Sequence, residues 1–379
     1  MMQIKKTGKK EVLPLILCGV LLAILLLLPT GFEQAVQFKD AEKTRARILS
    51  VSNERIIDTG LIRTGQQICT VTILSGKLKG ITADGFNTLN GSLESDKIFS
   101  KGDLVQCVIH YEIQDGEYKI LSLSLIDHYR IHYEIILFLL FAILIIIFAG
   151  KTGLRSLLSF VLSILSIWKI LIPLLLKGVN PLLIGMSVSL LLTVLIISLV
   201  YGFDKRCLSA CTASFAGIVI TALLSIICSA VFKIHGAVMP YSESLLYSGY
   251  AHLNLTQIFM ASIFIGASGA MMDLSVDITS AVYEIVQLNP DISKKRACIS
   301  GMNVARAAIG TMTTTLLLAY SGGYIALLMV FMAQGTPIQN ILNYRYIASE
   351  IIHTLAGSFG LVTVAPFTAF FASLIMVKK

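Results

Sequence analysis

Acidic side chains recur at helical spacing in the C-terminal half of the chain. Asp273, Asp277 and Glu284, with Ser280 between the last two, fall on one face of a predicted helix. Carboxylates at membrane depth are costly and usually line a cavity, a proton relay or a cation site. If this helix has already left the bilayer, the same residues form a solvated face, and for Glu284 the two interpretations are balanced.

The next predicted helix offers a cation to match these carboxylates. Asn303, Arg306, Gly310 and Thr313 share one face. The Arg306 side chain could extend to the membrane surface or pair with Asp273 or Asp277 inside a helix bundle.

A third polar pair, Glu350 and His353, is spaced to lie on one helix face. Such a pair can ligate a metal ion, but two ligands at this spacing also arise by chance. Histidine titrates near neutral pH and a nearby carboxylate tunes it, so we expect proton handling. We predict neither a metal site nor a cofactor.

Glycines accompany these polar residues on the same helices. Without a Cβ, glycine lets a neighbouring helix approach closely. We predict helix packing at Gly266, Gly269, Gly310, Gly357 and Gly360.

The sequence contains no zinc-protease, nucleophile-elbow, phosphate-loop or dinucleotide motif. An intramembrane aspartyl dyad needs two aspartates on different helices, whereas Asp273 and Asp277 share one. We therefore predict no catalytic residues and disfavour an enzyme.

The elements that carry these residues belong to a membrane protein. The 379 residues are 55% hydrophobic and only 14% charged, and apolar stretches of about 20 residues recur. The formal charge of +8 comes from short basic clusters between apolar runs, which set membrane orientation rather than bind nucleic acid.

We predict about eight transmembrane helices, with residues 323–335 re-entrant rather than spanning. Basic clusters in every second loop place the N-terminus in the cytoplasm, in a multi-pass protein of the cell membrane. If 323–335 is re-entrant, Lys378 and Lys379 also end inside. Lys169, within a predicted span, should reach the surface or join an ion pair. The predicted spans are 12–31, 131–150, 153–176, 180–202, 208–232, 255–274, 300–320 and 351–377, with a polar helical connector over 273–298.

Three regions follow from this pattern: an N-terminal anchor (1–35), an extracytoplasmic domain (36–129) and a polytopic domain (130–379). The basic start, including Lys5 and Lys6, resembles a signal peptide, but no clean cleavage site follows, so we favour an uncleaved anchor.

The extracytoplasmic domain is predicted to be all-β. Residues 68–74 and 104–109 alternate between apolar and polar, and glycines and the Asp115-Gly116 turn separate such segments. Five or six short strands suit an OB-like barrel or a sandwich. Cys69 and Cys107 lie on apolar strand faces, which favours buried thiols over a disulfide.

The C-terminal half resembles the YibE/F family of bacterial membrane proteins. The resemblance covers most of 130–375 and depends on Gly266-Ala-Ser-Gly-Ala-Met-Met-Asp273 with Asp277 and Glu284, Ser300-Gly-Met-Asn303 with Arg306 and Gly310-Thr-Met-Thr313, and Glu350-Ile-Ile-His353 with Gly357-Ser-Phe-Gly360. Asn87 to Gly91 and Lys101-Gly102-Asp103 are similar to the extracytoplasmic part of the YibE type.

The resemblance implies a transporter-like protein, often encoded beside a shorter YibF-like one. The partners it implies, besides the lipid bilayer, are a YibF-like membrane subunit or further copies of this chain. The family commonly has an acidic residue after Asn-x-x-Arg, where this chain has Ala307, so a carboxylate for Arg306 must come from another helix.

Two functions from different classes fit these observations. The first is a permease subunit in which Asp273, Asp277, Arg306, Glu350 and His353 line a path coupled to protons or cations. The second is a scaffold or assembly factor that binds an envelope partner through its β domain. We favour the first.

Overall fold

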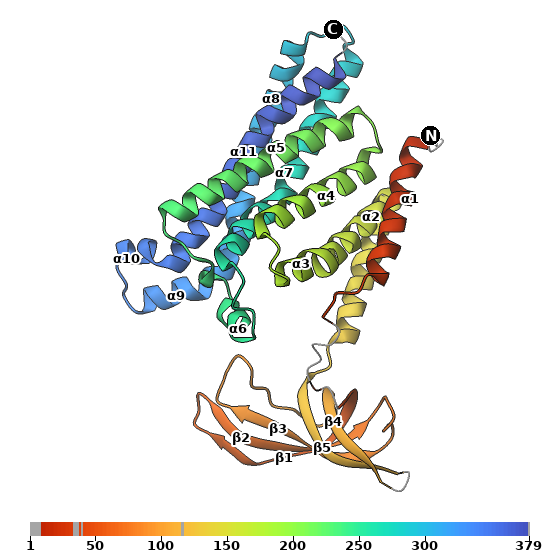
Figure 1. Cartoon of the computed structure of the whole chain (residues 1–379), viewed down its shortest axis with the longest axis vertical. Helices are drawn as coiled ribbons and strands as arrows, with labels where there is room; N and C mark the ends of the chain where they lie inside the picture. Colours follow the sequence, from red (N-terminus) through yellow and green to blue (C-terminus); the bar gives the residue numbers. More distant parts are fainter. Residues whose placement is uncertain (1–8, 33–37, 39–40, 115–116, 378–379) are drawn as a thin grey trace. The chain divides into compact units, whose positions relative to one another are not determined.

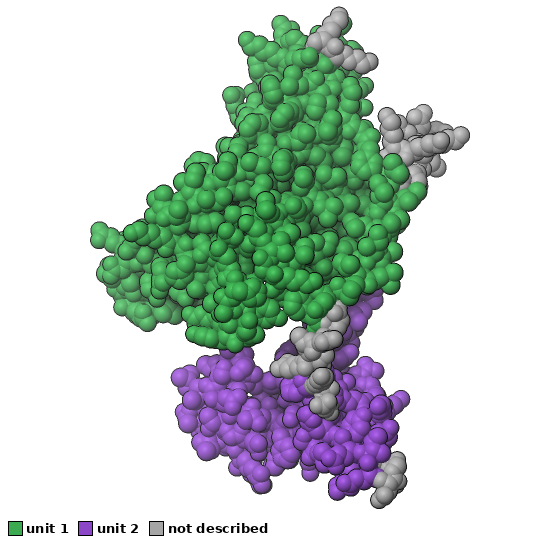
Figure 2. All heavy atoms as spheres, in the orientation of Figure 1, with its two compact units in different colours: residues 1–32, 145–379 green, residues 33–144 purple. Residues whose placement is uncertain are grey.

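The structure, a computed structural model, describes residues 9–32, 38, 41–114 and 117–377 (Figure 1). The chain divides into two compact units, residues 1–32 with 145–379 and residues 33–144 (Figure 2). The basic residues Lys5 and Lys6, the predicted Asp115-Gly116 turn and the terminal Lys378-Lys379 lie outside the described residues.

Five strands close into a β-barrel in the unit of residues 33–144. Their order around the ring is β1-β2-β3-β5-β4, and β3 pairs with β5 in parallel while the other neighbours are antiparallel. The closed ring decides between the two predicted architectures in favour of the barrel. The strands are β1 (Glu42–Asp58), β2 (Arg63–Ile73), β3 (Thr82–Asn90), β4 (Leu104–Gln114) and β5 (Glu117–His128).

The barrel core follows the alternation in the sequence. The two predicted strand segments, 68–74 and 104–109, lie in β2 and β4. Every second residue of β2 from Gln67 to Ile73 is buried, because successive strand side chains point to opposite faces. The apolar core comprises Ala46, Ile48, Cys69, Val71, Ile73, Leu78, Phe99, Val105, Cys107, Ile109, Leu123 and Leu125.

Two buried amides lie at the edge of this core. Gln67 exchanges two hydrogen bonds of 2.9 Å with the backbone of Phe99, and Asn87 donates to the carbonyl of Lys97 at 2.7 Å and to Gln67 Oε1 at 3.2 Å. Each buried amide thus satisfies backbone groups that would otherwise be costly to bury. Asn87, which carried part of the family resemblance, therefore holds the segment from Lys97 to Phe99 on the barrel.

The thiols of Cys69 and Cys107 are free and fully buried, as the strand pattern predicted. Burial raises the pKa of Cys69 to about 11 and that of Cys107 to about 12. A raised pKa means that the folded barrel holds these protons more tightly, so the resulting stability is present below the unfolded pKa and is lost as pH rises through the folded values.

We therefore expect neither barrel cysteine to react with iodoacetamide at about pH 8, where an exposed thiol of pKa about 8.5 reacts readily. Mass spectrometry of peptides from the labelled full-length protein measures the modification at each cysteine. The same protein labelled in denaturant is the control. Equal labelling of Cys107 in both conditions would contradict its burial.

Six helices are long and apolar enough to cross a membrane within the described part of the chain, and a shorter apolar helix covers Leu13–Leu27. The predicted count of eight is not confirmed. The helices are α1 (Lys9–Leu27), α2 (Ile131–Ser166), the π-helix η1 (Ile167–Leu171), α3 (Ile172–Leu176), α4 (Pro181–Tyr201), α5 (Lys205–Val231), the 3-10 helix η2 (Gly236–Val238), α6 (Ser242–Tyr247), α7 (Leu255–Leu288), α8 (Lys294–Ser321), the 3-10 helix η3 (Gly322–Tyr324), α9 (Ile325–Ala333), α10 (Ile338–Asn343) and α11 (Arg345–Met376).

Gly150 breaks α2 where the sequence predicted a boundary between two spans. Its φ of 54° and ψ of −125° are not helical, and a side chain at this φ would be strained. The helix beyond the break comes so close to the part before it that a Cβ at Gly153 would meet the Ile145 carbonyl at 2.5 Å. Two helical segments therefore follow one another with Gly150 as the turn.

The predicted polar helical connector over 273–298 is helical over most of its length, as the second part of α7 and the first residues of α8. The α7 helix continues without a break from Leu255 to Leu288, about 51 Å at 1.5 Å per residue, because no proline interrupts it. Only residues 289–293 connect it to α8. The short α9, of nine residues and about 14 Å, does not reach across roughly 30 Å of hydrocarbon as an α-helix alone.

Small residues bring α5, α7 and α11 together. Ser214 on α5 and Ser275 on α7 share a hydrogen bond of 2.7 Å. A Cβ at Gly217 would collide with Val364, and a Cβ at Gly360 with Thr221 and Met271. Close backbone approach of this kind is how helices associate in lipid, where the hydrophobic effect offers little between them.

Lys169, predicted to reach the surface or to join an ion pair, has no ion pair among the described residues. Its Nζ donates a hydrogen bond of 2.9 Å to the carbonyl oxygen of Leu28, just beyond the end of α1. Carbonyls at a helix C-terminus carry partial negative charge and have no partner within the helix. The lysine therefore caps α1 and holds it against η1.

Candidate functional site

A pocket of 420 Å³ encloses the predicted pair Glu350 and His353. Both side chains project from α11 one turn apart, as their spacing predicted. The walls come from segments far apart in the sequence, namely α7, the end of α8 with η3, the start of α11 and the loop after η2. The lining residues are Val238, Met239, Pro240, Phe259, Ser262, Ala319, Tyr320, Gly323, Tyr324, Ser349, Glu350 and His353.

His353 is held on two sides within this pocket. Its ring stacks on Tyr320 with 4.4 Å between centroids and 24° between planes, and Ser262 of α7 lines the pocket beside it. Its Nε2 and the hydroxyl of Tyr320 are buried without a hydrogen-bond partner among the described residues. Buried polar atoms nearly always have partners, so these two are available to a water, an ion or a substrate.

Glu350 has a tyrosine beside it. Tyr324 also lines the pocket, and its phenol interacts electrostatically with the Glu350 carboxylate. A phenol beside a carboxylate, one helical turn from an imidazole, forms a set of groups that can pass a proton. The pocket can therefore bind a small cation or relay protons.

Breaks in the helices place the two tyrosines. The 3-10 turn η3 separates α8 from α9, and Tyr320 and Tyr324 flank its glycines. The start of α11 is fixed by Tyr344, whose ring lies 5.0 Å from that of Phe331 on α9. Sequence reasoning missed both tyrosines and Ser262, since nothing in local spacing shows that the end of α8 meets the start of α11.

The acidic residues of α7 lie away from this pocket. Asp273, Asp277 and Glu284 are exposed on the helix surface, whereas Ser280 hydrogen-bonds Tyr201 of α4 at 2.6 Å. The three carboxylates do share one face, as their spacing implied.

The polar residues of α8 are also largely at its surface. Arg306 donates a hydrogen bond of 3.1 Å to Asn303, and both are exposed. Thr313 donates to the carbonyl of Ile309 at 2.9 Å, as hydroxyls often do within helices. Among the described residues Arg306 has no ion pair with Asp273 or Asp277.

One stripe of α7 joins the two groups of polar residues. Ser262, Gly266, Gly269, Asp273 and Asp277 succeed one another at three- or four-residue spacing, so they follow one side of the helix. The stripe begins at the pocket, where a Cβ on Gly266 would lie 2.9 Å from the Tyr320 hydroxyl and 3.4 Å from His353 Nε2. It reaches the first of the two aspartates about 17 Å further along.

The predicted packing glycines fall into two groups. Gly266, Gly357 and Gly360 face neighbouring side chains, with Ala267 3.1 Å from a Cβ built at Gly357. Gly269 and Gly310 face open space, with no described atom within 4 Å of such a Cβ beyond the chain neighbours and nearby backbone of the same helix. The first group serves helix packing in this chain, whereas the second contacts nothing in its described part.

Glu350 and His353 have the spacing of a metal-binding pair, but a metal site would need a third ligand beside them. Among the described residues no group of three or more His, Cys, Asp or Glu side chains is placed to hold a metal ion.

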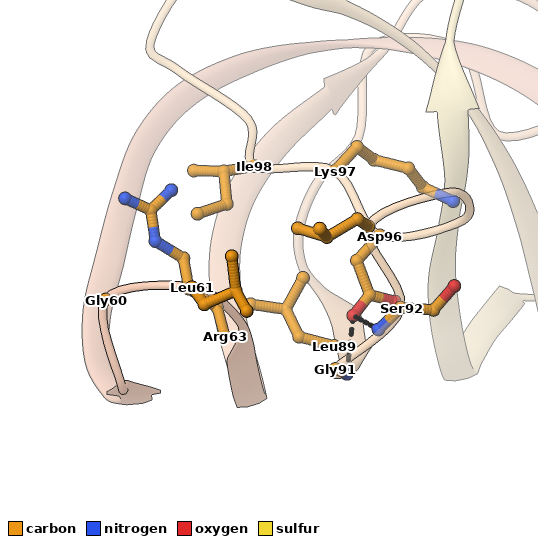
Figure 3. A pocket seen from close by; sticks show the side chains of 10 residues that line it. Gly60, Leu61, Arg63, Leu89, Gly91, Ser92, Asp96, Lys97 and Ile98 are labelled. Carbon is orange, nitrogen blue, oxygen red and sulfur yellow. Dashed lines mark hydrogen bonds between the residues drawn. The ribbon is translucent and has the colours of Figure 1, made fainter. Parts of the chain in front are cut away.

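The barrel has a pocket of its own, of 330 Å³ (Figure 3). It lies between the β1–β2 loop and residues 91–98, with Leu61 and Leu93 76% and 74% exposed at its rim beside Arg63 and Lys97. The Asp96 carboxylate shapes it by accepting hydrogen bonds from the backbone N–H groups of Asn90, Gly91 and Ser92 at 2.7 to 2.9 Å. These bonds hold the pKa of Asp96 below its usual range, and the bond from Asn90 has the largest effect.

A model of the family described as YibE/F-like protein matches residues 137–378 of the chain, which include α4 to α11. No curated protein and no solved structure matches.

Proposed function

The chain belongs to the YibE/F-like protein family, and from this premise we propose that it is a membrane transporter whose cargo or coupling ion passes the Glu350–His353 pocket. The observation that carries the proposal is the pocket itself. It brings a carboxylate, an imidazole and two phenols from three separate segments into one cavity. Two of its buried polar atoms, the Tyr320 hydroxyl and His353 Nε2, have no partner among the described residues and could bind an ion or a substrate.

The α7 stripe supports a path rather than an isolated pocket. Polar or glycine positions lead from Ser262 to Asp273 and Asp277, while Asn303, Arg306 and Thr313 follow α8 in the opposite direction. Ionisable residues within membrane-spanning helices characteristically mark ion or substrate routes. A change in protonation or cation occupancy at the carboxylates would then shift the equilibrium between two conformations, each open to one side of the membrane.

The membrane setting completes the proposal. The basic loops support a protein of the cell membrane with its N-terminus in the cytoplasm and its barrel on the outer side. We infer neither a catalytic role nor a bound cofactor for the polar residues.

Proton movement into vesicles tests the proposal. Full-length protein is reconstituted into liposomes that contain a pH-sensitive dye, and a potassium diffusion potential drives cations inward. We expect acidification several times faster than in protein-free liposomes, either directly or when a candidate cation is added outside. Rates equal to those of protein-free vesicles under every cation gradient would contradict transport by this chain alone.

A second function is favoured by the barrel pocket. Two exposed leucines beside two cations form a surface that suits binding of an acidic or amphipathic partner segment, as in a scaffold. A photo-reactive residue at Leu93 would then capture an envelope protein, and deletion of 40–128 would abolish function while Glu350→Gln would not. Full activity after that deletion would exclude the scaffold.

A further inference from the structure

One stripe at the surface of each of α7 and α8 carries polar residues and glycine. Six residues define this α7–α8 face, three on each helix: Gly269, Asp273, Asp277, Asn303, Arg306 and Gly310. The exposed surface of α2 shows what lipid contact looks like in the same chain, because it is made of Ile, Leu and Phe side chains from Ile135 to Phe148. A face with three charges is a poor match to lipid tails.

The charges on the two helices lie at the same level. The α7 and α8 helices run in opposite directions from the connection at 289–293. Asp277 is 11 residues before the last residue of α7 (288 − 277), and Arg306 is 12 residues after the first residue of α8 (306 − 294). At 1.5 Å per residue these positions are about 17 and 18 Å from the connection. Asp273 lies one turn beyond Asp277.

These charges have no ionic partner within the described chain. The hydrogen bond of Arg306 goes to Asn303, and no salt bridge among the described residues includes Arg306, Asp273 or Asp277. Arg206 at the start of α5 is already engaged, since Asp204 accepts from it at 2.8 Å and the rings of Tyr201 and Tyr283 lie against it. Charges at membrane depth are expected to be paired.

The two glycines of this face leave room for a close neighbour. A methyl group added at Gly269 or at Gly310 would have no described atom within 4 Å beyond its chain neighbours and the nearby backbone of its own helix. Exposed small residues beside polar ones are typical of the surfaces through which membrane helices associate.

We infer that a second copy of this chain packs on the α7–α8 face. A two-fold axis along the membrane normal, between α7 and α8, puts α7 of each copy beside α8 of the other. Asp277 then meets Arg306 of the other copy at the same level, twice, by symmetry. Such an isologous contact requires a surface that complements itself, and this face carries both signs at matching heights.

Cysteine cross-linking tests the contact. In a full-length variant without native cysteines, Gly310→Cys should form a disulfide-linked dimer in native membranes after mild oxidation, because Gly310 belongs to the face that the second copy covers. Leu223→Cys is the matched control: it is also half-exposed, but on α5 and among apolar residues. The control should stay monomeric on a denaturing gel. Equal cross-linking of both variants, or none at Gly310→Cys, would overturn the inference.

Charge reversal distinguishes a second copy from another partner. Arg306→Asp should lower the dimer yield at least about tenfold, since like charges would then oppose each other, and adding Asp277→Arg should restore it, because the pair is re-formed with exchanged signs. The yield is measured by cross-linking and by native mass spectrometry in detergent. Failure of the double variant to recover, while each protein remains folded, would assign the face to a different protein.

Discussion

Replacing Glu350 by Gln should reduce the flux through reconstituted protein by about 10- to 100-fold while leaving the amount of folded protein unchanged. The change removes the one carboxylate among the residues that line the pocket, yet it preserves the size of the side chain. Loss of one charge-assisted hydrogen bond to a cation or to a relayed proton carrier costs about 1.5–3 kcal/mol, which corresponds to a rate factor of roughly this size.

The same carboxylate-to-amide change at Asp291 is the matched control. Asp291 is exposed in the short connection between α7 and α8, away from the pocket, so its variant should transport like the original protein. Tyr324→Phe, which deletes only the hydroxyl, should give an intermediate rate. Undiminished flux in Glu350→Gln at equal protein density would remove the pocket from the transport route.

Adding one methyl group at Gly360 should destabilise the helix bundle by about 1–3 kcal/mol, the usual cost of overpacking. A Cβ there would collide with Thr221 and with the methyl group of Met271. Thr221 cannot turn away cheaply, because its side chain is β-branched and its hydroxyl donates to the Gly217 carbonyl at 2.9 Å. The α11 and α5 helices must therefore separate in Gly360→Ala.

The loss of stability is measured as a lower unfolding midpoint temperature in detergent, determined from the fraction of protein that remains monodisperse after heating. Gly19→Ala in α1 is the control, since a methyl group there meets no described atom within 4 Å. A second substitution, Thr221→Ala, should recover part of the midpoint by removing the obstructing hydroxyl. If Gly360→Ala unfolds at the temperature of the original protein, the contact between α5 and α11 is looser than described.

Local periodicity predicted the strands and the shared faces well. Alternation over 68–74 and 104–109 fixes which side chains enter the barrel, because a strand that slips by one residue would expose all of them. The Glu350–His353 spacing likewise placed both side chains in one pocket. In each case the information lies within a single element.

Contacts between elements were harder to predict. The sequence offered Arg306 as a partner for Asp273 or Asp277, but spacing within a helix does not determine how it is rotated toward its neighbour. Tyr320 and Tyr324 were not predicted for the same reason. Whether their side chains lie beside Glu350 and His353 depends on where α11 begins. For Lys169 the sequence offered the membrane surface or a carboxylate, and it could not show that the Leu28 carbonyl, at the end of another helix, accepts a hydrogen bond from this lysine.

The bond between Lys169 and Leu28 joins residues 141 positions apart in the sequence. A ribosome that has just completed α1 must therefore still synthesise the whole barrel and all of α2 before the lysine exists. Until then the Leu28 carbonyl lacks this donor, and non-local contacts of this kind form late. The contact that holds α1 against η1 therefore cannot form before synthesis has passed η1.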